Sequence, residues 1–137
     1  MADTLVIIPT YNEIDSLERI VGRLRQSVPE VDLLVVDDAS PAGTGDLAER
    51  LAAADPHLTV LHRHAKDGLG RAYLAGFDVA LSGGYQYVVE IDADGSHDPA
   101  EIPRFLAVLR TGADFAIGTR YLAGGGSAEL NRFRWVG

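Results

Sequence analysis

Residues 31–38 read VDLLVVDD, an apolar run that stops at the two acids Asp37 and Asp38. A run of this length closed by turn-forming residues is typical of a strand buried on both faces of a sheet. Further short runs lie at 5–8, 58–61, 87–91 and about 114–117. The sequence therefore predicts five strands.

Apolar residues at helical spacing fill the intervals between these runs, and they predict helices over about 14–28, 47–52, 69–81 and 102–109. Strands that alternate with helices imply a parallel sheet, because parallel neighbours need a long connection. The expected fold is an α/β three-layer sandwich with a mostly parallel twisted sheet, in a single domain over 1–137. In the third helix we expect one apolar side, formed by Leu69, Tyr73, Leu74, Phe77 and Leu81.

The composition narrows the possible classes of protein. The chain has 137 residues, 47% of them hydrophobic, which is enough for a core. It has no cysteine, which excludes disulfides and thiolate metal sites. A net charge of -8 argues against general nucleic-acid binding. Arg120, Arg132 and Arg134 nevertheless gather near the end of the chain, as either an anion site or a solvated basic face.

The sequence gives no sign of insertion into a membrane. It lacks the basic and apolar regions of a signal peptide, and no apolar run approaches the roughly 18 residues needed to span a bilayer. We therefore expect a cytoplasmic protein whose membrane contact, if it has one, is peripheral or comes from sequence outside this chain.

Two carboxylates, Asp92 and Asp94, follow the fourth predicted strand. Residues i and i+2 of an extended segment point to the same side, so both can face one ligand. Close carboxylates repel each other unless a cation neutralises them, and hard oxygen ligands suit Mg²⁺ or Mn²⁺. The alternative is a turn with solvated acids, which Gly95 and Pro99 would favour.

Polar residues also follow the first two strands. Asp37 and Asp38 could accept hydrogen bonds from a nucleotide, or could simply begin a turn. Tyr11 could stack on a base and Glu13 could meet ribose hydroxyls, whereas Asn12 could merely cap the next helix. The carboxyl ends of parallel strands share one edge, so we expect these residues to converge there.

Five blocks in order carry a resemblance to a known family. The chain resembles family 2 glycosyltransferases with a GT-A-like fold, in particular their polyprenyl-phosphate (dolichyl-phosphate) mannosyltransferase branch. The resemblance covers essentially the whole chain. The blocks are IPTYNE (8–13), VVDDASPAGT (35–44), KDGLGRAY (66–73), DADGSH (92–97) and GTRY (118–121).

The resemblance implies a role for each matching position. It assigns Asp92 and Asp94 to the metal and the donor diphosphate, with Mg²⁺ or Mn²⁺ as the metal, and Ser96 to the place where many members have a glutamine ligand. Arg120 and Arg134 match positions that handle the acceptor phosphate, and Arg120 counts with Asp92 and Asp94 as catalytic. The donor nucleotide positions are Pro9, Tyr11, Glu13, Asp37, Asp38, Lys66 and Gly68.

The implied reaction transfers mannose from GDP-mannose to a polyprenyl phosphate, with inversion at the sugar. Members of the family continue past Gly137, so the resemblance also implies a C-terminally truncated chain and peripheral membrane contact in the complete protein. Three alternatives stay open: a family 2 transferase with UDP-glucose or another donor, an inactive nucleotide-binding fragment, and a receiver-type signalling domain.

Overall fold

A computed structural model describes residues 2–11, 14–38, 43–64, 69–93, 97–112, 115–119 and 129–133. Its contacts divide the chain into two compact units, Met1–Pro99 and Ala100–Gly137. Each unit is described here by itself. The single domain over 1–137 stays a prediction.

The first unit is built on a parallel sheet of four strands in the order β3-β2-β1-β4. All three neighbouring pairs are parallel, with Ile8 opposite Val35 in β1 and β2, for example. The predicted strands of this unit and their parallel arrangement are thus confirmed. The strands are β1 (Thr4–Thr10), β2 (Asp32–Asp38), β3 (Leu58–Arg63) and β4 (Tyr87–Glu90).

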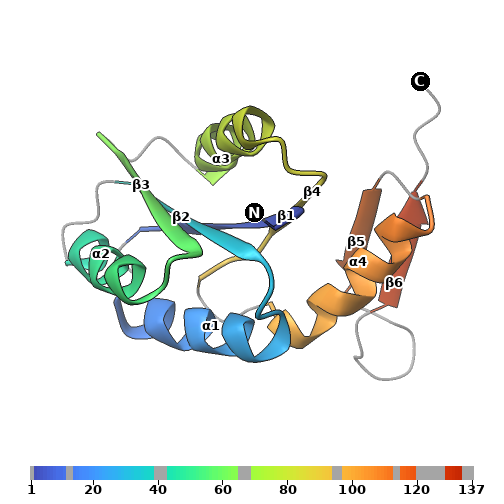
Figure 1. Cartoon of the computed structure of the whole chain (residues 1–137), viewed down its shortest axis with the longest axis horizontal. Coiled ribbons are helices and arrows are strands. Elements are labelled where there is room, and N and C mark those ends of the chain that lie inside the picture. The colour runs from blue at the N-terminus through green and yellow to red at the C-terminus, as the bar shows by residue number, and fades with distance from the viewer. Residues whose placement is uncertain are drawn as a thin grey trace. The chain divides into compact units, whose positions relative to one another are not determined.

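Helices cover both faces of this sheet, which gives the three layers expected from the sequence. Helix α3 (Leu69–Gly83) lies on one face, and α1 (Ile14–Ser27) and α2 (Thr44–Ala54) lie on the other (Figure 1). Asp15 in the first turn of α1 and Arg25 in its last turn complement the helix dipole. Gly43, just before α2, has a φ of 78°, a left-handed conformation that favours glycine.

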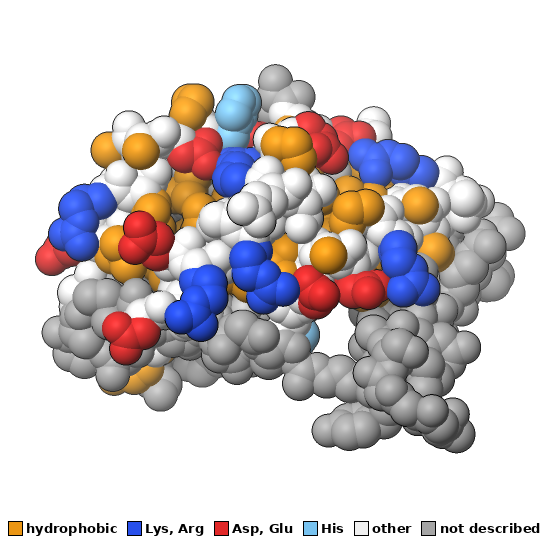
Figure 2. Space-filling view, turned by 90° about the horizontal axis from the view of Figure 1, so that it is seen from below, with side chains coloured by type: hydrophobic (Ala, Val, Ile, Leu, Met, Phe, Trp, Pro, Cys, Tyr) orange, Lys and Arg blue, Asp and Glu red, His pale blue; other side chains and the backbone are white. Residues whose placement is uncertain are grey.

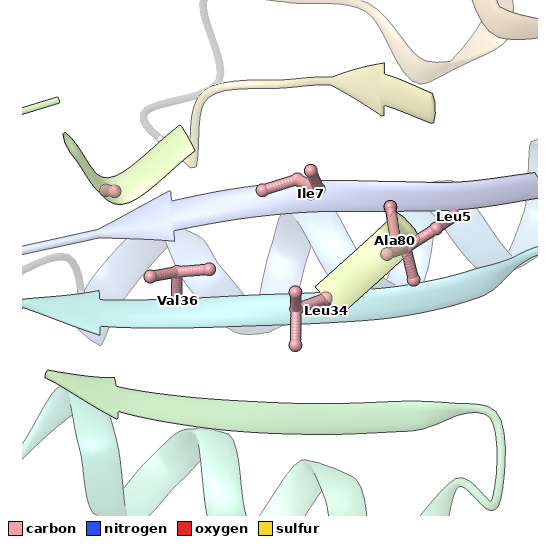
Figure 3. Packing of buried hydrophobic residues seen from close by; sticks show 6 residues of the cluster. Leu5, Ile7, Leu34, Val36 and Ala80 are labelled. Atoms are coloured by element: carbon pink, nitrogen blue, oxygen red, sulfur yellow. The ribbon is translucent and has the colours of Figure 1, made fainter. Parts of the chain in front are cut away.

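Helix α3 approaches the sheet very closely at one point of the core. Leu5 and Ile7 of β1 and Leu34 and Val36 of β2 pack with Ala80 of α3 (Figure 3). Gly76 is buried in the same helix, and a Cβ placed on it would lie 2.7 Å from Cγ2 of Ile7. Helix α3 therefore rests on the sheet through small residues, four positions apart, at 72, 76 and 80.

This packing corrects one expectation from the sequence. Leu74 and Leu81 were expected on the apolar side of the third helix, but they are 61% and 81% exposed. Tyr73 and Phe77 do pack against the core, together with Val79. The buried face is centred on small residues because the helix lies too close to the sheet for leucine side chains to fit between them.

The described residues of the second unit form one helix and two short strands. Helix α4 (Ile102–Arg110) follows the single 3-10 turn Pro99–Glu101, and β5 (Phe115–Thr119) pairs antiparallel with β6 (Glu129–Phe133). The fifth predicted strand exists, and its partner in the described residues is β6, which runs antiparallel to it. The sequence of β6, ELNRF, has no apolar run that would have predicted a strand.

Charges of both signs are interspersed over the face that carries α1 (Figure 2). Some of them are paired: Arg23 lies 2.8 Å from Asp98, and Arg25 lies 2.6 Å from Asp55. The described part of this face therefore has no continuous basic surface of the kind that binds nucleic-acid backbones.

In the described residues, none of the helices has the length and apolar character needed to cross a bilayer.

Candidate functional site

The carboxyl ends of all four parallel strands meet at one edge of the sheet, and several of the polar residues singled out from the sequence lie there. Thr10 ends β1 and Tyr11 follows it, Asp38 ends β2, and Asp92 follows β4. Strand β1 lies between β2 and β4, so the strand order reverses at this point. Ligands of open α/β sheets bind at such a switch point, outside the carboxyl ends of the strands.

Asp37 is a buried carboxylate that joins the ends of two strands. The Thr10 hydroxyl donates a hydrogen bond of 3.1 Å to its Oδ1 atom. Gly45 at the start of α2 comes close to it, since a Cβ there would lie 3.0 Å from Asp37 Oδ2. The hydrogen bond joins the ends of β1 and β2 at this edge, and the start of α2 lies close beside them.

Asp38 is also buried, and an arginine that the sequence analysis did not select compensates its charge. Arg63 Nη1 at the end of β3 lies 2.8 Å from Asp38 Oδ1, and both side chains are largely withdrawn from solvent. A paired buried carboxylate costs far less than an isolated one. The pairing of β2 with β3 places Asp38 and Arg63 opposite each other in register. In the sequence, the position of Arg63 after the third apolar run was the one sign of this ion pair.

Asp92 has two described partners that reach it from different parts of the chain. The hydroxyl of Tyr73 in α3 donates a hydrogen bond of 2.9 Å to Asp92 Oδ1. The backbone N–H of Asp92 donates to Nδ1 of His97 over 3.0 Å, while Nε2 of His97 lies 3.9 Å from Oδ2. The sequence predicted Asp92 as a ligand, but it gave Tyr73 only a packing role.

A further acid, Glu90, ends β4 two residues before Asp92. Burial raises the pKa of the Glu90 carboxyl, the negative charge of Asp92 raises it further, and His97 partly offsets the effect. Burial and the charge of Asp92 therefore both disfavour a second negative charge at Glu90.

The remaining predicted positions are distributed unevenly. Pro9 is buried within β1, and Tyr11 after it is half-buried. Seven of the predicted site residues lie outside the described residues, so their placement stays a prediction: Glu13, Lys66, Gly68, Asp94, Ser96, Arg120 and Arg134. Within the part of the chain that the structure describes, no group of three His, Asp or Glu side chains is arranged to hold a metal.

A parallel α/β sheet with carboxylates at its switch point places the chain among the open α/β proteins, which bind their ligands at this edge. Comparison with known proteins narrows this class. The family model described as glycosyl transferase family 2 matches residues 5–136 of this sequence. The chain belongs to this family, which excludes the receiver-type alternative.

Relatives and a solved structure agree with this assignment. The chain is 61% identical over 121 residues to an undecaprenyl-phosphate mannosyltransferase of Micrococcus luteus, covering 88% of this chain and 49% of that protein. It is 59% identical over 123 residues to a polyprenol monophosphomannose synthase of Mycolicibacterium smegmatis, covering 89% and 46%. The chain thus spans about half the length of these two relatives.

The fold is similar to that of a mannosyltransferase from Pyrobaculum calidifontis solved with GDP-mannose and Mn²⁺. The TM-score is 0.63 at 28% identity, covering 85% of this chain and 34% of the other. This similarity confirms the GT-A-like fold class predicted from the sequence.

Proposed function

We propose that this chain is the donor-binding part of an enzyme that transfers mannose from GDP-mannose to a polyprenyl phosphate. The observation that carries the proposal is the 61% identity, over 121 residues, to an undecaprenyl-phosphate mannosyltransferase. The structural neighbour solved with GDP-mannose supports the same donor. The buried Asp37 and Asp38 and the half-buried Tyr11 lie where such a nucleotide would bind.

The residues present fit a divalent cation. Asp92 supplies hard carboxylate oxygen at the shared strand edge, just after β4. Asp92, Asp94 and Ser96 would hold Mg²⁺ or Mn²⁺, which when bound offsets the charge that grows on the departing diphosphate. The Mn²⁺ in the neighbouring structure supports this choice of metal class.

The acceptor needs orientation more than activation. A phosphate monoester is largely ionised at neutral pH because its second pKa is about 6, so no general base has to remove a proton. In this proposal Arg120 and Arg134 orient it through charge-assisted hydrogen bonds. A phosphate oxygen forms the new bond to the anomeric carbon as the bond to GDP breaks, which inverts the sugar and releases GDP. The lipid acceptor implies peripheral contact with a membrane, at its cytoplasmic face.

Turnover of the donor tests this function. The chain is mixed with GDP-mannose, a polyprenyl phosphate and Mn²⁺, and both GDP release and lipid-extractable mannose are measured. We expect GDP release that Asp92→Asn reduces by at least about tenfold. UDP release from UDP-glucose at an equal or higher rate would contradict the proposed donor and favour another family 2 reaction. Binding of GDP-mannose without any GDP release would favour the alternative of a binding-only fragment.

A further inference from the structure

One side chain far from the predicted ligands in sequence holds the carboxylate of Asp92. Tyr73 lies 19 residues earlier, on α3, and its hydroxyl donates a hydrogen bond of 2.9 Å to Asp92 Oδ1. We propose that Tyr73 is a positioning residue, which fixes the Asp92 carboxylate in the orientation that the divalent cation of the donor site requires. This inference rests on the proposed function, because it takes Asp92 as a ligand of that cation.

The position of the Tyr73 hydroxyl is set by the core. The aromatic ring packs against the cluster that Leu5 and Ile7 form with their neighbours. Helix α3 cannot shift easily toward the sheet, because Gly76, one turn after Tyr73, already lies against Ile7. A ligand is held precisely when the residues that support it are themselves locked by packing. Tyr73 therefore transmits the geometry of the core to the carboxylate.

The two oxygens of Asp92 have different surroundings. Oδ1 accepts the hydrogen bond from Tyr73, whereas Oδ2 lies 3.9 Å from His97 Nε2, too far for a hydrogen bond. Nδ1 of His97 accepts the backbone N–H of Asp92 at 3.0 Å. Both the main chain and one oxygen of Asp92 are thus fixed, and Oδ2 is the oxygen less engaged by the described residues.

Holding a carboxylate in advance affects metal affinity. A free side chain must give up its rotational freedom when it binds a cation, whereas a hydrogen-bonded one has already done so. Loss of a partner that orients a ligand typically costs about 10-fold to 100-fold in metal affinity or activity. For the single neutral hydroxyl of Tyr73 we expect the lower end, a loss of about tenfold.

Calorimetry of GDP binding, in EDTA and then in excess Mn²⁺, separates this role from a merely structural one. The ratio of the two affinities measures the contribution of the metal. Tyr73→Phe keeps the ring and removes the hydroxyl, so affinity in EDTA should be unchanged while the ratio falls about tenfold. The matched control is Tyr85→Phe, which removes a hydroxyl that donates to Asp32 Oδ2 over 2.6 Å, at the beginning of β2. The ratio should be unchanged in this control.

A double-mutant cycle with Asp92→Asn tests whether Tyr73 acts through Asp92. In the Asp92→Asn background, Tyr73→Phe should cause no further loss of the ratio, because the carboxylate that it orients is gone. Additive losses would overturn the inference, and so would a ratio in Tyr73→Phe equal to that of the parent. Thermal unfolding of each variant identifies any that does not fold.

The possible failures are distinguishable. If the parent chain gains no affinity from Mn²⁺, or if Asp92→Asn keeps the parent's ratio, the proposed metal site is wrong and this inference falls with it. If the parent gains affinity and Asp92→Asn loses it, but Tyr73→Phe behaves like the parent, only the role of Tyr73 is wrong.

Discussion

Replacing Gly76 by alanine should destabilise the protein, against the usual effect of this substitution in a helix. Alanine in a helix interior is normally about 1 kcal/mol more favourable than glycine. At Gly76, however, the added Cβ would lie 2.7 Å from Cγ2 and 2.8 Å from Cδ1 of the fully buried Ile7. Carbon atoms pack best at about 3.5–4.0 Å, so the helix or Ile7 has to move by roughly 1 Å.

The two effects can be weighed against each other. Extra methyl groups in a packed core cost about 1–3 kcal/mol, and the gain in helix propensity offsets about 1 kcal/mol of this. The expected net loss for Gly76→Ala is therefore about 1 kcal/mol, or roughly 3–4 °C in Tm for a chain of this length. The control is Gly22→Ala on the exposed side of α1, where a Cβ would meet nothing within 4 Å. There, stability should rise by up to about 1 kcal/mol.

Thermal unfolding of the parent and both variants checks this prediction, and GDP binding in Mn²⁺ adds a second readout. A shift of α3 would carry Tyr73 away from Asp92, so Gly76→Ala should also weaken metal-dependent binding. The reasoning about close packing is refuted if Gly76→Ala stabilises the chain as much as Gly22→Ala does.

Three further predictions follow from the charged groups. Asp92→Asn should keep or raise the Tm measured without ligand. Burial is the main cause that raises the pKa of Glu90 and the charge of Asp92 is the second, so the variant removes a repulsion between the two carboxylates. A clear fall in Tm would contradict this. Asp38→Ala should weaken GDP binding by about tenfold, equally with and without Mn²⁺, because its proposed partners are base or ribose groups; calorimetry that finds a loss only in Mn²⁺ would exclude that role. Burial, and then the hydrogen bond donated to Asp32, raises the pKa of Tyr85 to about 12 from 10.0, so the folded state keeps this proton longer than the unfolded state. The resulting stability is complete below pH 10 and is lost as the pH rises toward about 12; Tyr85→Phe should flatten this part of a plot of Tm against pH, and an unchanged slope would contradict the assignment.

The strands of the parallel sheet could be predicted because burial on both faces requires continuous apolar runs, as in residues 31–36. Acids placed directly after such runs also had to meet at one edge, and the structure confirms this for Asp37, Asp38 and Asp92. Local pattern and the topology of parallel sheets were enough for these features.

What could not be predicted depends on contacts between distant parts of the chain. The buried side of α3 is made of small residues whose apolar signal is weak, so Leu74 and Leu81 were wrongly expected at the core. The pairing of β5 with β6 depends on backbone hydrogen bonds and not on an apolar pattern. Arg63 and Tyr73 reach their carboxylate partners across 25 and 19 residues, and the sequence alone gave no register that would bring them together.

Calorimetric titration with GDP-mannose, in EDTA and in Mn²⁺, tests most directly whether this chain is a metal-assisted donor site. The titration is repeated with UDP-glucose and with Asp92→Asn. We expect GDP-mannose to bind more tightly in Mn²⁺ than in EDTA, UDP-glucose to bind at least about tenfold more weakly, and Asp92→Asn to remove most of the gain from Mn²⁺. Equal affinity for the two donors, or a gain from Mn²⁺ that survives in Asp92→Asn, would contradict this expectation.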